Sequence, residues 1–270
     1  MRAKLDPAPC PEHLIGFAER LATAAGEVVR RHFRGGLEVH DKADATPVTL
    51  ADREAEAEIR RLIAESHPAH GVVGEEQGSD RPDAEYVWVV DPIDGTKRFI
   101  TGNPLFGTLI ALLRDGRPIL GVIEMTLLGE RWIGAAGRPT VLREGAEARE
   151  VRVRPCPSLG QAVLAASSPH MFDEQGEFPA FERVRKAAKM ALYGGDCFNY
   201  GTLACGYIDL VVEADMAAYD FMALVPVVAG AGGVVTDWQG AALGLETRGQ
   251  LIAAGDRRVH EAALELLGRG

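Results

Sequence analysis

The hydrophobic period of the chain changes near residue 70, and this change constrains the fold more than any other feature. Apolar residues recur at helical spacing over 12–33 and 49–66, which predicts two amphipathic helices. The next apolar residues form short runs rich in β-branched and aromatic side chains, which predict strands at 86–90, 107–113 and 118–124. Arg114-Asp115-Gly116 separates the last two runs and is typical of a hairpin turn. The first half therefore predicts helices packed on an antiparallel sheet.

The second half alternates between strand-like and helical segments. Strands are expected at 163–166, 208–213, 234–236 and 251–254. Helices are expected at 181–190, at 199–205, at 221–231 and, after a cap at Asp256, up to Leu267. Residues 134–149 are rich in Gly, Ala and Glu and show no period, so we place a boundary there. We expect one compact unit with an α+β half over residues 1–145 and an α/β half over residues 146–270.

An acidic turn follows the first predicted strand. Residues 88–96 read Trp-Val-Val-Asp-Pro-Ile-Asp-Gly-Thr, so two carboxylates, Asp91 and Asp94, stand three residues apart. Asp-Pro and Asp-Gly pairs are also common in surface turns, and a plain turn remains the alternative. The two carboxylates and a free Ile93 carbonyl are hard oxygen ligands that suit Mg²⁺. Gly95-Thr96 would open a short helix whose free N–H groups accept phosphate oxygens.

Three further acidic residues stand where elements are expected to begin or end. Glu75 lies in Gly74-Glu75-Glu76, after an apolar pair, and its alternative is a solvated surface pair. Asp220 directly precedes an apolar helix, where an N-cap is the alternative. Asp52 follows Thr49 at capping-box spacing, and its other interpretation is a carboxylate that orients a hydroxyl.

Together these motifs resemble the inositol-monophosphatase-like family of Mg²⁺-dependent phosphomonoesterases. The resemblance runs through Gly-Glu-Glu at 74–76, Trp-x-x-Asp-Pro-Ile-Asp-Gly-Thr-x-x-Phe at 88–99, and Tyr-Asp at 219–220 followed by Ala-Gly-x-Gly-Gly. It covers nearly the whole chain in order, and its central motif is highly specific. The resemblance implies a layered α-β-α-β-α sandwich, usually assembled as a homodimer.

The resemblance also implies roles for individual residues. The catalytic residues would be Asp52, Thr96 and Glu75. Of these, Thr96 and Asp52 would activate the attacking water. The ligands of two or three Mg²⁺ ions would be Glu75, Asp91, the Ile93 carbonyl, Asp94 and Asp220. Phosphate and substrate would contact Asp94, Gly95, Thr96, Asp196, Glu213 and Asp220. No covalent phosphoenzyme is implied, because the ions supply the nucleophile from bound water.

Departures from the common family pattern bear on the substrate. The usual Arg-x-x-Gly-[Ser/Thr] is aligned with 191–196, where the Arg is missing and Asp196 appears, and Met222 and Leu224 replace small residues. These departures resemble the histidinol-phosphate phosphatases of histidine biosynthesis, as do the segments 97–102, 104–108, 168–172, 194–197 and 236–238. The expected reaction is hydrolysis of L-histidinol phosphate to L-histidinol and phosphate. Asp196 and Glu213 would pair with its ammonium and imidazole groups; a helix cap and a solvated strand end are their alternatives.

Other interpretations remain open or are disfavoured. An inositol-1-monophosphatase or a broad-specificity phosphatase of the same family is the main alternative, and a non-catalytic phosphate- or metal-binding protein is a remote one. The Asp91-x-x-Asp94 spacing disfavours an aspartyl-phosphate mechanism, which needs two Asp residues two positions apart. His67-Pro-Ala-His70 could form half of a zinc site, but a turn is the preferred interpretation.

Composition limits the functions open to the chain. It carries 29 Lys and Arg against 39 Asp and Glu, a net charge of −10, so its surface repels a nucleic-acid backbone. The four cysteines form no C-x-x-C pair, which favours a reducing compartment. No apolar stretch is long enough to span a bilayer, and Met1 to Pro11 contains no apolar run typical of a signal peptide. We expect a cytoplasmic protein that binds a small phosphorylated substrate, with no nucleic-acid or membrane partner.

Overall fold

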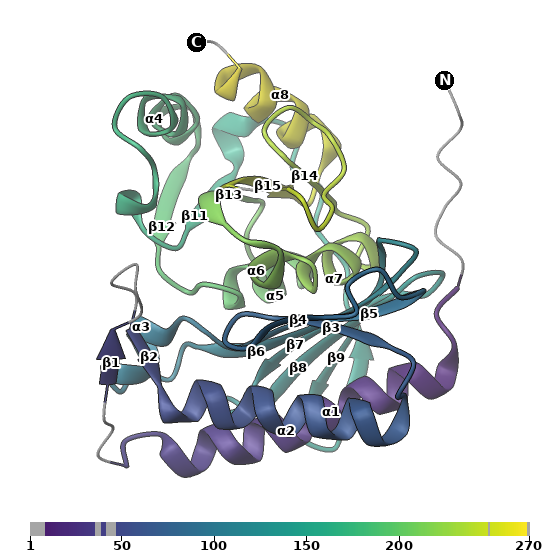
Figure 1. Ribbon diagram of the computed structural model, residues 1–270. Helices are drawn as coiled ribbons and strands as arrows, with labels where there is room; N and C mark the ends of the chain where they lie inside the picture. The colour runs from purple at the N-terminus through teal and green to yellow at the C-terminus, as the bar shows by residue number, and fades with distance from the viewer. Residues whose placement is uncertain (1–8, 36–38, 42–46, 248, 269–270) are drawn as a thin grey trace.

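Helices and sheets alternate in the order α-β-α-β-α in the computed structural model, which describes residues 9–35, 39–41, 47–247 and 249–268 (Figure 1). The first layer holds α1 (Glu12–His32) and α2 (Leu50–Ser66). Between them in the sequence stands the small pair β1 (Val39–Asp41) and β2 (Pro47–Thr49). This order confirms the expected layered sandwich. The sequence segment on which the signal-peptide expectation rests lies largely outside the described residues.

The second layer is an eight-stranded sheet, ordered β10-β9-β8-β7-β6-β5-β3-β4. Its strands are β3 (Gly71–Gly74), β4 (Gly78–Asp80), β5 (Tyr86–Asp94), β6 (Gly107–Arg114), β7 (Arg117–Met125), β8 (Glu130–Ala135), β9 (Val141–Glu144) and β10 (Glu147–Glu150). All neighbours are antiparallel except β3 and β5. The β6–β7 turn is confirmed: Asp115 and Gly116 have φ of 50° and 73°, as a two-residue hairpin requires.

The remaining layers come from the second half of the chain. A five-stranded sheet runs β12 (Met190–Tyr193), β11 (Val163–Ala166), β13 (Leu210–Met216), β15 (Gly249–Ala254) and β14 (Val234–Thr236). Between the sheets lie α5 (Phe198–Ala204), α6 (Ala218–Phe221) and α7 (Leu224–Gly230) (Figure 1). The outer layer holds α4 (Glu177–Ala187) and α8 (Arg257–Leu267). The short helices are α3 (Thr96–Ile100) and the 3-10 turns Leu159–Gln161 and Pro169–Met171.

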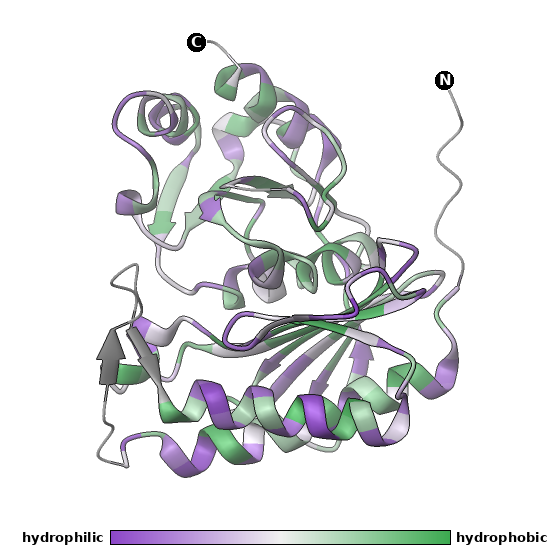
Figure 2. Cartoon of the chain, viewed as in Figure 1, coloured by the Kyte–Doolittle hydropathy of each residue, from purple (hydrophilic) through white to green (hydrophobic). Residues whose placement is uncertain are grey.

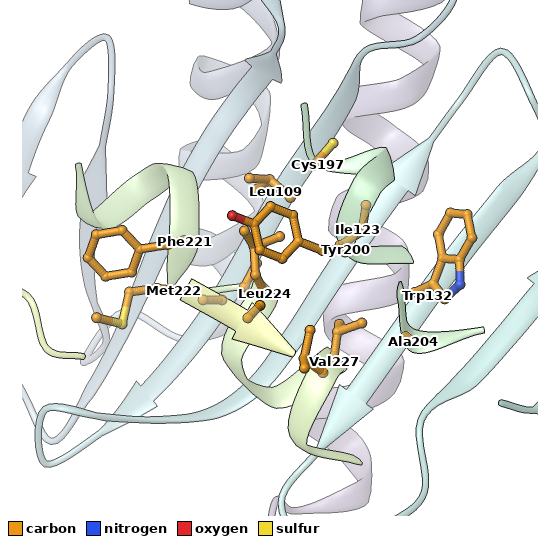
Figure 3. Close-up of a cluster of buried hydrophobic side chains, with 14 of the residues drawn as sticks. Leu109, Ile123, Trp132, Cys197, Tyr200, Ala204, Phe221, Met222, Leu224 and Val227 are labelled. Carbon is orange, nitrogen blue, oxygen red and sulfur yellow. The ribbon is translucent and has the colours of Figure 1, made fainter. Parts of the chain in front are cut away.

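The central strands β5, β6 and β7 of the first sheet are buried on both faces, which explains their continuous apolar runs. Along β5, Val87 and Val89 face the core shared with α5–α7, whereas Trp88 and Val90 face the core shared with α1 and α2. Hydrophilic and hydrophobic residues alternate along those two outer helices in Figure 2. In Figure 3, Tyr200 of α5 lies in the inner cluster with residues of both halves: Leu109, Ile123, Phe221, Leu224 and Val227. This shared core joins the two halves.

Three local expectations were wrong. Residues 134–149 are not patternless, because they contain the end of β8 and most of the hairpin β9–β10. Every residue of β10 is exposed, so no apolar alternation marks it. The helix expected over 181–190 ends at Ala187, and the chain then forms the exposed edge strand β12. The helix expected over 221–231 is divided into α6 and α7.

Candidate active site

The acidic turn at the end of β5 is stiffened by its own hydrogen bonds. The pairing of β5 with β6 shifts register between Asp91 and Asp94. The Ile93 N–H donates to Asp91 Oδ1 at 2.9 Å, and the Thr96 hydroxyl donates to the Ile93 carbonyl at 3.1 Å. The Thr108 hydroxyl donates to the Pro92 carbonyl at 2.8 Å. The turn at the end of β5 is therefore fixed by hydrogen bonds within the protein, and it is not a solvated surface turn.

Three carboxylates converge at this turn. One oxygen each of Asp91, Asp94 and Asp220 lies within 4.8 Å of the others. Asp220 comes from α6, where its Oδ2 accepts a 2.6 Å hydrogen bond from the Ala217 N–H. The N-cap residue of α6 is Ala217, three residues before Asp220, so the N-cap interpretation of Asp220 was wrong. The structure thus brings together three of the predicted ligands, although Asp220 is more than a hundred residues away in sequence.

Burial and mutual repulsion disfavour the charged forms of these groups. Burial raises the pKa of the Asp91 carboxyl, and the negative charges of Glu75, Asp94 and Asp220 raise it further. Burial also raises the pKa of Asp94, with a further contribution from Asp196. Burial raises the pKa of Asp220 to about 7, although the hydrogen bond from the Ala217 N–H opposes the shift. A hard divalent cation would relieve this repulsion, and the all-oxygen donor set fits one.

Glu75 approaches the cluster from the neighbouring strand. It directly follows β3, and its N–H donates to the Val90 carbonyl of β5 at 3.2 Å. Parallel pairing of β3 with β5 places the ends of both strands at the same sheet edge. Its charge is the largest electrostatic influence on Asp91 after burial. The alternative of a solvated surface pair is therefore wrong for Glu75.

The residue that sequence reasoning missed here is Glu56 of α2. It is fully buried, and its carboxylate accepts hydrogen bonds from the N–H groups of Glu76 at 2.8 Å and Gln77 at 3.1 Å. Arg60 Nε donates to the same carboxylate at 2.7 Å. A Cβ at Gly74 would overlap the Glu56 carboxylate, which gives a physical reason for Gly in Gly-Glu-Glu. The sequence did contain a signal for Glu56, because it is an acidic residue at a position of the helix that faces inward.

The remaining predicted catalytic residues lie at helix starts. Asp52 stands in the first turn of α2 and is 1% exposed. The expected short helix after the acidic turn is α3, and Gly95 at its N-cap has a left-handed φ of 87°. The N–H groups of Gly95 and Thr96 belong to the start of that helix, where no intrahelical acceptor is available. The phosphate contacts assigned to them stay predictions.

Asp196 lies in the site but its carboxylate is paired. Arg98 Nε of α3 donates to Asp196 Oδ2, and both side chains are largely buried. The neighbouring Cys197 N–H donates to Asp94 Oδ2 at 2.6 Å. The N-cap residue of α5 is Cys197, so the helix-cap alternative for the Asp196 side chain was wrong. The ion pair itself was not foreseen from the sequence.

Glu213 is held inside the wall of the site. It lies on β13 and is 1% exposed, so the alternative of a solvated strand end was wrong. The Tyr200 hydroxyl donates to its Oε2 at 2.6 Å, and the Ser167 N–H donates to its Oε1 at 2.9 Å. Burial raises the pKa of Glu213, and these hydrogen bonds oppose the shift. Its donors carry no charge, so an ionised Glu213 keeps its negative field.

Asn199 is a second residue that sequence reasoning missed. It is 7% exposed on α5, and within the described residues its side-chain Nδ2 has no hydrogen-bond partner. Its side chain lies beside Gly195, where a Cβ would overlap it. The Arg-x-x-Gly-[Ser/Thr] spacing that was aligned with 191–196 also fits Phe198, Gly201 and Thr202 on this helix.

The histidines and cysteines outside the site have structural surroundings. His70 Nδ1 accepts a hydrogen bond from Trp88 Nε1 at 3.1 Å, and its ring stacks on His67 with centroids 4.6 Å apart. The His70 N–H donates to the His67 carbonyl, which confirms the turn over the zinc pair. All four cysteines are free thiols. Within the described part of the chain, no helix combines the length and apolar character needed to cross a membrane.

Comparisons with known proteins agree with the geometry. The model of the inositol monophosphatase family matches residues 11–269. The bifunctional phosphatase IMPL2, chloroplastic, of Arabidopsis thaliana is 48% identical over 95% of this chain and 75% of its own. A histidinol-phosphatase of Mycobacterium tuberculosis is 34% identical over 94% of this chain and 97% of its own. The solved structure of an inositol monophosphatase from Zymomonas mobilis is 45% identical, has a TM-score of 0.86, and is matched over 95% of this chain and 98% of its own.

Proposed function

Because the chain belongs to the inositol monophosphatase family, and is thus a phosphomonoesterase, we propose that it hydrolyses L-histidinol phosphate to L-histidinol and phosphate with Mg²⁺ as its metal. The observation that carries the metal part is the convergence of Asp91, Asp94 and Asp220. The choice of L-histidinol phosphate as substrate is supported by acidic residues in the site wall and by relatives named histidinol-phosphatase. This reaction belongs to histidine biosynthesis.

The proposed ligands are the three clustered carboxylates, Glu75 and the Ile93 carbonyl. That carbonyl already accepts a hydrogen bond from Thr96 but has a second lone pair for a cation. Two or three Mg²⁺ ions, when bound, would lower the pKa of bound water and neutralise phosphate charge. The carboxylates would hold the ions where nearby protein lowers the dielectric and strengthens the effect of their charge.

The other proposed roles follow from position. The N–H groups of Gly95 and Thr96 bind the phosphate at the start of α3. Asp52 and the Thr96 hydroxyl orient the attacking water, and Thr96 must then give up its hydrogen bond to Ile93 or share it. We also assign Asp94 and Asp220 a contact with the substrate.

Acidic wall residues would select a cationic alcohol. L-histidinol phosphate carries an ammonium and an imidazole group, both of which gain from a nearby carboxylate. Asp196 already has a cationic partner, Arg98, whereas Glu213 has only the neutral donors Ser167 and Tyr200. We therefore assign the larger share of cation recognition to Glu213. We assign to Asp196 a weaker contact with the cationic substrate at the rim of the site.

The test compares phosphate release from L-histidinol phosphate and myo-inositol 1-phosphate, each with Mg²⁺ and with EDTA. We expect a Mg²⁺-dependent kcat/KM at least about 100-fold higher for L-histidinol phosphate, equivalent to roughly 2.7 kcal/mol. Equal rates would keep the family chemistry but remove the substrate assignment. Activity that persists in EDTA would contradict the metal assignment.

One specific observation favours a second candidate, hydrolysis of inositol 1-phosphate. The Zymomonas mobilis structure, which is described as an inositol monophosphatase, is 45% identical to this chain. The same assay decides between the two substrates. The proposal also includes a homodimer and a cytoplasmic location; light scattering on the purified protein tests the first, and fractionation of the source cells tests the second.

A further inference from the structure

The loop from Gly194 to Cys197 has a strained backbone beside the acidic cluster. Gly194, Gly195 and Asp196 have successive positive φ values of 94°, 109° and 47°. Glycine adopts such angles without penalty, but an aspartate in the left-handed region is held there at a conformational cost. The loop therefore depends on contacts that keep it in this conformation.

Two contacts attach the loop to the acidic turn and the helix that follows it. The Arg98 guanidinium binds the Asp196 carboxylate, and it lies so close to Gly194 that a Cβ there would overlap it. The Cys197 N–H donates to Asp94 Oδ2 at 2.6 Å. Arg98 and Asp94 stand four residues apart in sequence, so two adjacent residues of the loop are fastened to one segment.

We propose that Arg98 is a positioning residue for the metal cluster: by holding Asp196, it keeps the Cys197 N–H on one oxygen of Asp94 and leaves the other oxygen for a cation. The inference rests on the proposed role of Asp94 as a ligand. Arg98 itself touches neither phosphate nor metal in this scheme. Groups that orient metal ligands in this way contribute about 10–100-fold to metal affinity.

A positioning effect and a charge effect have opposite signs. Replacing Arg98 by methionine removes a positive charge close to the cluster, which by electrostatics alone strengthens cation binding. Loss of the loop conformation weakens it instead, because Asp94 loses its orienting donor. The direction of the change in Mg²⁺ affinity therefore separates the two effects.

The experiment is calorimetric titration of the metal-free protein with Mg²⁺ alone, in the wild type, Arg98→Met, Asp196→Asn and the double variant. We expect Arg98→Met to bind Mg²⁺ about 10–100-fold more weakly, against the charge effect, and Asp196→Asn to bind it more weakly through the positioning and charge effects together. The double variant restores the charge balance but not the contact between residues 98 and 196. Its affinity for Mg²⁺ should therefore be as low as that of the single variants. Arg98→Lys should recover part of the affinity, because the lysine ammonium can still bind the Asp196 carboxylate, although without the fork of donors.

Two further variants serve as controls for the interpretation. Arg114→Met removes an arginine that pairs with Glu85 at the opposite end of the β5–β6 pair and should leave the Mg²⁺ affinity unchanged. Asp94→Asn tests the premise: if it does not weaken Mg²⁺ binding, the metal assignment fails. If Asp94→Asn weakens binding but Arg98→Met leaves it unchanged or strengthens it, or if the double variant returns to wild-type affinity, the positioning role of Arg98 is wrong.

Discussion

The Glu56 carboxylate occupies the space beside Gly74 that any Cβ at residue 74 would need. The two residues join α2 to the end of β3, and Glu56 receives the N–H groups of Glu76 and Gln77 in the same place. The position of Glu75, which lies between Gly74 and these donors, is therefore set by a buried acid on a different element.

Gly74→Ala should destabilise the protein by about 1–3 kcal/mol, because the new methyl group displaces Glu56 from its donors. Chemical denaturation measures the free energy of unfolding. Gly244→Ala is the matched control, since a Cβ there would meet no atom within 4 Å. Equal stability of the two variants would show that the fit at Gly74 is not tight.

Asp94→Asn should leave a folded protein whose kcat is lower by roughly 100-fold or more, since even groups that only orient a ligand contribute 10–100-fold. The same change removes one of several repelling charges, so the metal-free variant should melt at a higher temperature than the metal-free wild type. Steady-state kinetics and thermal melting without Mg²⁺ check both effects. Near wild-type turnover would contradict the ligand role.

Stability of the metal-free protein should fall as the pH rises through 7. The pKa of Asp220 is raised by burial from 3.8 to about 7, so the protonated form stabilises the fold at low pH and this contribution is lost on ionisation. Mg²⁺ at 100 times its Kd adds about 2.7 kcal/mol, or roughly 5–10 °C. Melting with and without Mg²⁺ at pH 6 and pH 8 should show the larger metal effect at pH 8. Asp220→Asn should reduce the pH dependence.

Acid should destabilise the contact between His70 and Trp88. Burial lowers the pKa of His70 from 6.5 to about 4, and the charges of His67 and His13 lower it further. A protonated ring could no longer accept the Trp88 N–H at Nδ1. A lowered histidine pKa adds stability above pH 6.5 that is lost as the pH falls toward 4. His70→Asn, which cannot titrate, should flatten the melting temperature over this range. The exposed His170→Asn should not, and an equal response from both would refute the assignment.

Glu213→Gln should raise KM for L-histidinol phosphate more than for a neutral phosphomonoester, because it removes the charge that attracts the ammonium. The amide oxygen can keep the hydrogen bond from the Ser167 N–H, and the Tyr200 hydroxyl can turn to accept from the amide NH2 group, so the fold should survive. Asp196→Ala should raise the KM ratio by less, because Arg98 already offsets its charge. Equal effects of Glu213→Gln on both substrates would remove it from recognition.

Local pattern predicted the regular elements where apolar periodicity was strong. The helices of the first layer, the strands of the β6–β7 hairpin and the turn at Asp115-Gly116 were all foreseen, because each depends on neighbours in sequence. The exposed strand β10 was missed because it carries no apolar alternation. The strand β12 was missed because its four residues form an apolar run without alternation, into which the expected helix was extended. Their place is decided by pairing with the strand beside them.

The sequence by itself determined the acidic turn, with Asp91, Asp94 and a following helix start, since Pro and Gly at fixed positions dictate the local backbone. Only the tertiary structure decided which distant groups meet there. Asp220 reaches the turn because α6 and α7 pack on the first sheet, Glu56 because α2 covers β3, and Asp196 because Arg98 holds it. Such contacts join elements through burial and charge pairing, which no local pattern of residues records.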